Sequence, residues 1–186
     1  MLEHFFRNLP TLETERLILR KLKYEDKSDI FEYANNPKVA EHVIWYAHQD
    51  EMDTIDFLNF TYDSYNKNLP ASWGIEWKEN NKIIGTVGFN SFDVQNQKGE
   101  IGYALSQEYW GKGIIVEACK EIIEIGFKQL FLNRIEARCS PENVNSAKVL
   151  EKLGFTFEGI LRQQIFAKEK FWDLKIYSLL LEDFRK

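Results

Sequence analysis

The sequence predicts a mixed α/β fold, in which one mostly antiparallel sheet carries helices on both faces. Two observations support this. Strand-like runs alternate with segments of helical periodicity, and most of the connections between them are short and turn-rich. The 186-residue chain is 44% hydrophobic and contains only four prolines, with no Ser/Gly-rich linker. Such a chain buries one sizeable core, so a single domain over residues 1–186 is expected.

The first third of the chain predicts one strand followed by two helices. Arg16–Leu22 alternates apolar and basic residues, which is typical of a half-buried strand. Tyr24–Asn35 places apolar residues on one helical face and ends before Pro37. Asp50–Lys67 mixes apolar residues and acids at helical spacing, and Pro70 follows its end.

Three antiparallel strands are expected next, over Ser72–Lys78, Lys82–Asn90 and Lys98–Leu105. Their connections, Glu79–Asn81 and Asp93–Gln97, are rich in turn-forming residues.

The last third predicts two helices and three strands. Apolar residues recur at helical spacing over residues 114–130, and Gly154 is placed to end a second helix as its C′ residue. The expected elements are the helix 114–130, the strand Arg134–Ser140, the helix Asn145–Leu153, and the strands Phe155–Phe166 and Phe171–Glu182, joined by a hairpin at Ala167–Lys170.

The turn Tyr109-Trp110-Gly111-Lys112-Gly113 is the most informative stretch for function. It joins a strand to a helix, and the first N–H groups of a helix have no intrahelical acceptor and lie at the positive end of the helix dipole. Glycine lets the backbone approach a phosphate. The spacing fits neither a P-loop nor a dinucleotide fold, since Val116 stands where the latter needs a third glycine. The turn therefore predicts a site for a phosphate-bearing cofactor.

The wider context resembles the GNAT N-acetyltransferase superfamily, and in particular its ribosomal-protein (alanine/serine) N-terminal acetyltransferase branch. Trp110–Ile115 is similar to the acetyl-CoA motif Q/R-x-x-G-x-G/A, with Trp110 replacing Gln/Arg and Ile115 replacing the final small residue. Three further segments resemble that branch and, with the first, cover about residues 11–186: Thr14–Arg20, Ile83–Phe89, and Asn143 to Ser146 followed by Lys152–Phe155.

The resemblance implies a seven-stranded sheet that is splayed between its fourth and fifth strands, with acetyl-CoA as donor. The backbone that the splay leaves unpaired must find partners. In the family the pantetheine arm supplies them. Carried over, Tyr103, Ala104 and Leu105 offer backbone groups to pantetheine, and the amides of Gly111, Lys112, Gly113, Ile114 and Ile115 hold the pyrophosphate. Lys112 is either a partner of that anion or an exposed turn lysine.

Asn143 and Ser146 have two interpretations each. The resemblance implies that the Asn143 amide holds pantetheine and that Ser146 protonates the departing thiolate. However, Ser-Pro-Glu-Asn-Val-Asn-Ser is also an ordinary helix start, in which Asn143 or Asn145 is only an N-cap.

The general base is a departure from the pattern. An ammonium must lose its proton before it can attack a thioester, and amine pKa values are about 8 to 10.4. Relatives carry a glutamate where this chain has Ile165. Glu100 is the best remaining carboxylate, with Glu41 and Asp173 behind it. The alternatives for Glu100 are an ion pair with Lys98 or Arg138, and for the base a chain of water molecules.

Acceptor recognition is expected from the two early helices and the late hairpin. Aromatic residues are more often core than pocket, but six are candidates for a pocket wall: Trp45, Tyr46, Trp73, Phe89, Phe166 and Trp172.

Composition limits the partners and the compartment. The net charge of −5 argues against general nucleic-acid affinity, and no segment reaches the roughly 20 apolar residues that span a bilayer. The N-terminus does not read as a signal peptide. Cys119 and Cys139 are expected to be reduced core residues in a cytoplasmic protein. The three histidines show no metal-ligand spacing, so no metal is expected.

The sequence thus predicts an acetyl-CoA-dependent N-acetyltransferase acting on a primary amine. The acceptor is a protein N-terminus such as that of a ribosomal protein, or a small amine such as a polyamine or an amino-compound antibiotic. A second copy of the chain is kept as a candidate partner. The rivals are a non-catalytic acyl-CoA sensor, which the missing glutamate favours, and an interaction module with a merely structural glycine turn.

Overall fold

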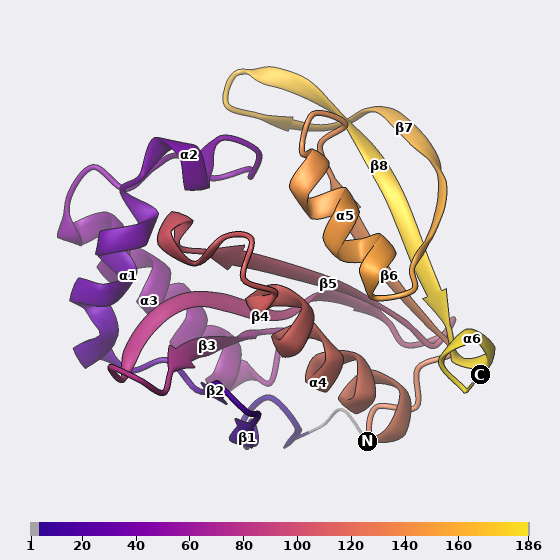
Figure 1. The fold of residues 1–186 in the computed structure, drawn as a ribbon, viewed down its shortest axis with the longest axis horizontal. Coiled ribbons are helices and arrows are strands. Elements are labelled where there is room, and N and C mark those ends of the chain that lie inside the picture. The colour runs from indigo at the N-terminus through magenta and orange to yellow at the C-terminus, as the bar shows by residue number, and fades with distance from the viewer. Residues whose placement is uncertain (1–3, 186) are drawn as a thin grey trace.

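A computed structural model describes residues 4–185 as one mixed sheet between helices (Figure 1). The order of the strands across the sheet is β1-β2-β3-β4-β5-β6-β8-β7. All neighbours are antiparallel except β5 and β6, which are parallel. The strands are β1 (Leu12–Glu13), β2 (Leu17–Arg20), β3 (Ser72–Trp77), β4 (Lys82–Asp93), β5 (Lys98–Leu105), β6 (Arg134–Cys139), β7 (Thr156–Ala167) and β8 (Lys170–Leu180).

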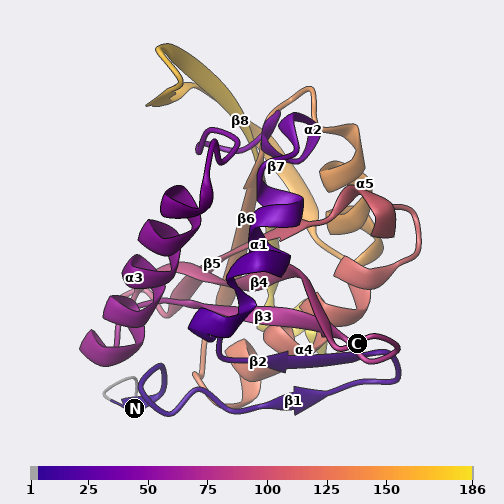
Figure 2. The ribbon, with the colours of Figure 1, turned by 90° about the vertical axis from the view of Figure 1, so that its left-hand side faces the viewer.

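Helices cover both faces of the sheet, as predicted. Figure 2 shows α3 on one side of the strands and α4 and α5 on the other. The α-helices are α1 (Lys27–Ala34), α2 (Pro37–Ala40), α3 (Glu51–Lys67), α4 (Ile114–Lys128), α5 (Val144–Lys152) and α6 (Leu181–Phe184). Short 3₁₀ turns precede α1 at Tyr24–Asp26 and follow β5 at Gln107–Tyr109. None of the described helices is long and apolar enough to cross a membrane.

The helix ends follow from local chemistry. The Asp50 carboxylate accepts hydrogen bonds from the Met52 and Asp53 amides, so it caps the start of α3. Asn68 ends the same helix in the left-handed conformation, with φ of 55°, as a C-terminal asparagine often does. Gly154, with φ of 85°, follows α5 as predicted.

Two apolar cores hold the helices on the sheet. The larger core packs α4 on the strands through residues such as Phe89, Ile101 and Ile122. The smaller core packs α1 and α3 on the opposite face through Leu22, Ile30 and Leu58, among others. Both cysteines are buried free thiols. Since side chains alternate between the faces of a strand, Ile101 and Tyr103 belong to the α4 face and Glu100 to the other.

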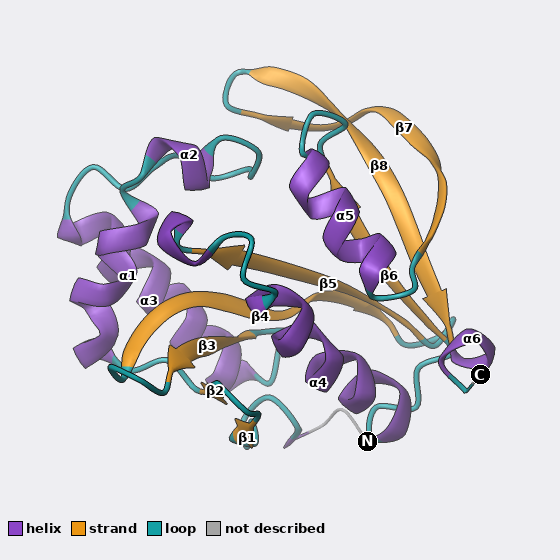
Figure 3. Cartoon of the chain, in the orientation of Figure 1, coloured by secondary structure: helices purple, strands orange, loops and turns teal. Residues whose placement is uncertain are grey.

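The predicted splay lies between β5 and β6. These strands pair only from Lys98↔Arg134 to Ile101↔Ala137. Beyond that pair they separate, and the wedge between β5 and the β6–β8–β7 half is visible in Figure 3. The opening has the place in the strand order that the family resemblance implied.

The structure differs from the expected elements in short pieces. The sheet has eight strands instead of seven, because residues 12–13 form a two-residue strand beside β2. Residues 37–40 form α2, which was not predicted because Pro37 reads as a stop signal although it occupies a helix start. The last predicted strand ends at Leu180, and residues 181–184 turn into α6.

Candidate active site

The opening between β5 and β6 exposes backbone on one edge of β5. The other edge of that strand pairs with β4, where Tyr103 faces Val87 and Ala104 faces Thr86. Of the three residues predicted to offer backbone to pantetheine, Leu105 already has a partner for its carbonyl. The Trp110 indole Nε1 donates to it at 2.8 Å, which explains what the unusual Trp110 does in this motif.

The glycine turn adopts a left-handed backbone that favours glycine. Gly111 and Gly113 both have φ of 75°, and Gly113 is the N-cap of α4. A Cβ on Gly111 would meet no atom within 4 Å, and one on Gly113 would meet only the Arg16 guanidinium at 3.9 Å. The turn is therefore an open surface. The amides of Ile114 and Ile115, in the first turn of α4, have no intrahelical acceptor.

Arg16 and Glu117 hold this turn in place. Arg16 Nη1 donates to the Lys112 carbonyl at 3.0 Å, and its Nε donates to the Glu117 carboxylate at 2.7 Å. Thr14 Oγ1 donates to the same carboxylate at 2.6 Å. Burial alone would raise the pKa of Glu117, but the hydrogen bonds from Thr14 and Arg16 outweigh it and lower the pKa. These roles were not predicted, although Thr14 and Arg16 lie in the quoted first-strand motif.

Lys112 itself is exposed, and no ion pair within residues 4–185 fixes it. Its Nζ lies 5.0 Å from the centre of the Tyr109 ring. The ammonium is therefore free to reach an anion on the turn.

Asn143 and Ser146 meet at the start of α5. The Asn143 Oδ1 accepts a hydrogen bond from the Ser146 amide at 3.0 Å, so Asn143 caps the helix. This cap uses only the oxygen of the side-chain amide. Ser146 is 8% exposed, and its Oγ lies 2.8 Å from the Tyr103 hydroxyl.

The Tyr103 side chain is the functional candidate that sequence reasoning missed. It joins β5 to α5 across 43 positions of the chain, a contact that no local pattern reveals. Burial raises the pKa of the Tyr103 phenol well above its ordinary value. The phenol thus keeps its proton at neutral pH. Burial also raises the pKa of the nearby Cys139 thiol, although a hydrogen bond with Ser146 opposes the shift.

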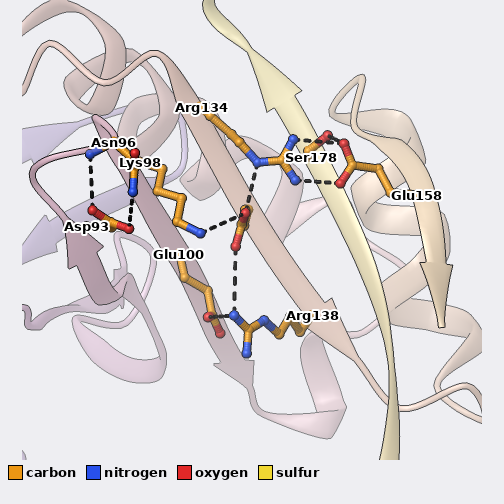
Figure 4. Close-up of polar contacts among 9 residues, drawn as sticks. Asp93, Asn96, Lys98, Glu100, Arg134, Arg138, Glu158 and Ser178 are labelled. Carbon is orange, nitrogen blue, oxygen red and sulfur yellow. Dashed lines mark hydrogen bonds and ion pairs between the residues drawn. The ribbon is translucent and has the colours of Figure 1, made fainter. Parts of the chain in front are cut away.

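Glu100 lies on the opposite face, one residue before the last β5–β6 pair. Figure 4 shows its carboxylate facing the Arg138 guanidinium, and the Oε2–Nη2 distance is 3.3 Å. Arg138 is the first β6 residue beyond the pairing, so this ion pair sits where the strands part. The expected alternative for Glu100, an ion pair with Arg138, is present.

Glu100 is one end of a charged network along this face of β6. Glu136, which is 6% exposed, accepts from Arg134 Nε at 2.8 Å and lies 3.8 Å from Arg138 Nη2. Arg134 in turn holds Glu158, and hydrogen bonds from Arg134 and Ser178 lower the pKa of Glu158 to about 2. The Nε of Arg138 is buried and has no hydrogen-bond partner among the described residues.

Among the described residues, neither of the other two predicted bases contacts the Glu100–Arg138 ion pair. Glu41 is exposed after α2. Asp173 accepts a hydrogen bond from the Gln163 amide at 2.8 Å, within the bulge of the β7–β8 hairpin. Ile165 pairs with Trp172 in that hairpin and brings no acid.

This arrangement fits acetyl-CoA. The β5 edge offers unpaired backbone to an extended arm, and the α4 turn offers amide donors and open glycine surface to a pyrophosphate. The two features are consecutive in the chain, since β5 ends at Leu105 and α4 begins at Ile114.

A model of the acetyltransferase (GNAT) domain matches residues 16–156, about three quarters of the chain. The chain belongs to the GNAT acetyltransferase family. It is an N-acetyltransferase with acetyl-CoA as donor, which sets aside the reading as a plain interaction module. The uncharacterised N-acetyltransferase p20 of Bacillus licheniformis is 38% identical to this GNAT protein over 176 residues, 95% of this chain and 99% of the relative.

Two solved structures extend the comparison. The ribosomal-protein-S5-alanine acetyltransferase of Vibrio fischeri is 30% identical, with a TM-score of 0.79 over 95% of this chain and 100% of the other. The microcin C7 self-immunity acetyltransferase, solved with acetyl-CoA and AMP, has a TM-score of 0.80 over 90% of this chain and 94% of the other. At 23% identity the second shows the shared GNAT fold alone.

The aromatic candidates for acceptor recognition divide into two groups. Trp73 and Phe89 are wrong as pocket residues, because both are fully buried in the larger core. Trp45 and Tyr46 line a surface hollow in the loop between α2 and α3. Trp172 lies in the β7–β8 hairpin below Lys168, and the exposed Phe166 contacts Phe171 edge to face. The remaining candidates for the acceptor wall lie on the loop and the hairpin, where Trp172, at 9% exposure, is itself buried.

Proposed function

We propose that this GNAT protein transfers the acetyl group of acetyl-CoA to a primary amine at the opening between β5 and β6. The observation that carries the proposal is the continuous path from the glycine turn, along the free edge of β5, to the Tyr103–Ser146 pair. Tyr103 and Ala104 would bind pantetheine through their backbone, and the amides of residues 111–115 would bind the pyrophosphate. Lys112 would add an ammonium, and the Asn143 side-chain NH₂ a further donor.

The two faces of the sheet would divide the proton transfers. On the α5 face, Ser146 would give a proton to the departing thiolate and take the proton that the attacking nitrogen still has to lose. The Tyr103 phenol, 2.8 Å away, would keep its own proton and orient the Ser146 hydroxyl. On the α3 face, the Glu100 carboxylate would take the ammonium proton of the acceptor, directly or through water. The 3.3 Å contact between Arg138 and Glu100 is longer than a strong hydrogen bond.

Two classes of acceptor fit this site. Similarity to the S5-alanine acetyltransferase of Vibrio fischeri supports a protein N-terminus. The loop and hairpin aromatic residues support a small amine equally well, since either ligand would enter between them.

The test is turnover of acetyl-CoA, measured as thiol release, against a panel of N-terminal peptides and small amines. We expect release that depends on one class of amine and is lost in Ser146→Ala. CoA binding without release on any amine would support the acyl-CoA sensor instead.

A further inference from the structure

A surface hollow lies beside the β7–β8 hairpin, and none of its lining residues belongs to the proposed donor site. Its volume is about 480 Å³, and it is formed by the loop after α2 and the first two turns of α3. Seven residues line it: Trp45, Tyr46, Ala47, His48, Gln49, Asp53 and Asp56.

The side chains of this hollow favour a cation. Two aromatic rings and two carboxylates line it, and no lysine or arginine is among its described lining residues. Burial lowers the pKa of His48, and the Asp53 charge does not compensate, so the imidazole is neutral at neutral pH. Its Nδ1 lies 2.8 Å from Thr54 Oγ1.

The carboxylates of Asp53 and Asp56 differ in their hydrogen bonding. Asp53 accepts a hydrogen bond from the Gln49 amide at 2.7 Å, which holds the loop against α3. Asp56 is exposed and forms no ion pair or hydrogen bond recorded within residues 4–185. Its charge is therefore available to a ligand.

The ammonium group of a lysine in this chain already lies against the rim of the hollow. Lys168, at the tip of the hairpin, places its Nζ 5.7 Å from the centre of the Tyr46 ring and 6.0 Å from that of Trp172. The same Nζ donates to the Ala40 carbonyl. Tyr46 is 62% exposed, so its ring also has surface free for a ligand.

The hollow belongs to the acceptor side of the molecule. The Lys168–Ala40 contact joins the hairpin to α2, and Asn36 at the start of α2 donates to Gln107, just beyond the end of β5, at 2.9 Å. The α2 segment thus contacts both halves of the splayed sheet, and the loop that forms the hollow continues from it. It lies on the α3 face, to which Glu100 also points.

From these contacts we infer that the hollow binds a second ammonium group of the acceptor, which makes the preferred substrates small amines with two or more positive charges. One amine would be acetylated at the opening, while a distal ammonium rests between Tyr46, Trp45 and Asp56. This rests on the proposed function and narrows its acceptor class.

The test compares α,ω-diamines, from propane to octane, with the alkylamines of equal length. We expect at least one diamine to have a kcat/KM roughly tenfold above that of its monoamine, since two exposed contacts to a cation each add a few-fold. Asp56→Asn should remove most of that advantage and leave monoamine turnover unchanged. Asp63→Asn is the matched control, because Asp63 lies on the same helix in an exposed ion pair with Lys67.

A binding readout separates this inference from the proposed function. The best diamine should quench the fluorescence of Trp45, and the Trp45→Phe variant serves as the blank. Quenching should saturate in the wild type. The affinity obtained from it should fall several-fold in Asp56→Asn. Saturable binding without acetylation would contradict the proposed function and support the hollow. Equal kcat/KM for every diamine and its monoamine, or full diamine preference in Asp56→Asn, would overturn the inference, even in an active enzyme.

Discussion

The two faces of the sheet meet at the β5–β6 opening with opposite chemistry. On the α5 face the groups are neutral, buried and already hydrogen-bonded, as in the 2.8 Å contact between Tyr103 and Ser146. On the α3 face they are charged and partly exposed, as in the Glu100–Arg138 pair. A buried hydroxyl keeps its proton over a wide pH range, whereas an ionised carboxylate can accept a proton from an amine. We therefore expect proton donation on the α5 face and pH-dependent proton acceptance on the α3 face.

The largest expected effect is on the neutral face. Ser146→Ala should lower kcat roughly 100-fold at every pH, with little change in KM for acetyl-CoA, because general acid catalysis is worth at least that much. Tyr103→Phe should act in the same direction. Since the raised pKa of Tyr103 keeps its phenol protonated, neither variant should change the shape of the pH profile.

The double variant tests whether the pair acts as a unit. Ser146→Ala with Tyr103→Phe should be no slower than the slower single variant. Ser178→Ala is the control, because Ser178 is also a buried serine but bonds to Glu158 on β7. If the losses in kcat of the two single variants add up in the double variant, Ser146 and Tyr103 act independently.

If the glycine turn binds the donor, disrupting it should weaken CoA binding without altering the pH dependence of the rate. Gly113→Val places a branched side chain where φ is 75° and where the pyrophosphate would approach. CoA affinity measured by titration calorimetry should fall by at least ~2 kcal/mol, about 30-fold. The pH profile should keep its shape.

Gly154→Val is the matched control for backbone strain. Gly154 also has positive φ, 85°, but it ends α5 away from the turn. It should lower the melting temperature without a comparable loss of CoA affinity. Normal affinity in Gly113→Val would remove the turn from the donor site.

The charged face should respond to pH. Glu100→Gln should lower kcat about tenfold and remove the acidic limb of the rate profile, since an amide cannot take a proton. Glu136→Gln, in the neighbouring network, should keep that limb. A wild-type rate and profile in Glu100→Gln would leave water or another carboxylate as the base.

The smallest expected effect is at Asn143, where it distinguishes a helix cap from a residue that also binds CoA. Loss of the cap alone should cost about 1 kcal/mol of folding free energy. If the side-chain NH₂ also binds pantetheine, Asn143→Ala should weaken CoA binding as well. Asp50→Ala removes a comparable cap from α3 and should reduce stability alone. A lowered melting temperature with unchanged CoA affinity would make Asn143 only a cap.

Hydrophobic periodicity and turn-forming residues predicted the long helices and strands, because both are local properties of the sequence. The strands from Ser72 to Leu105 and the helix beginning at Ile114 lie close to where they were expected. Short pieces such as α2 were missed because four residues carry no period. The position of the splay came from the family resemblance and matches the β5–β6 register.

The site was predictable where it is made of backbone and less so where side chains meet. The Gly111 and Gly113 conformations follow from residue type. The Tyr103–Ser146 and Glu100–Arg138 contacts each join residues about 40 positions apart. Alternation along a strand already places Tyr103 and Glu100, three residues apart, on opposite faces, but only the fold decides which helices cover each face.

The structure of the protein with bound CoA tests the division between the two faces most directly. We predict that the pyrophosphate binds the amides of residues 111–115 and that pantetheine lies along β5. The sulfur atom should lie within hydrogen-bond reach of the Ser146 hydroxyl on the α5 face. A sulfur atom beside Glu100 and Arg138, on the α3 face, would contradict this prediction.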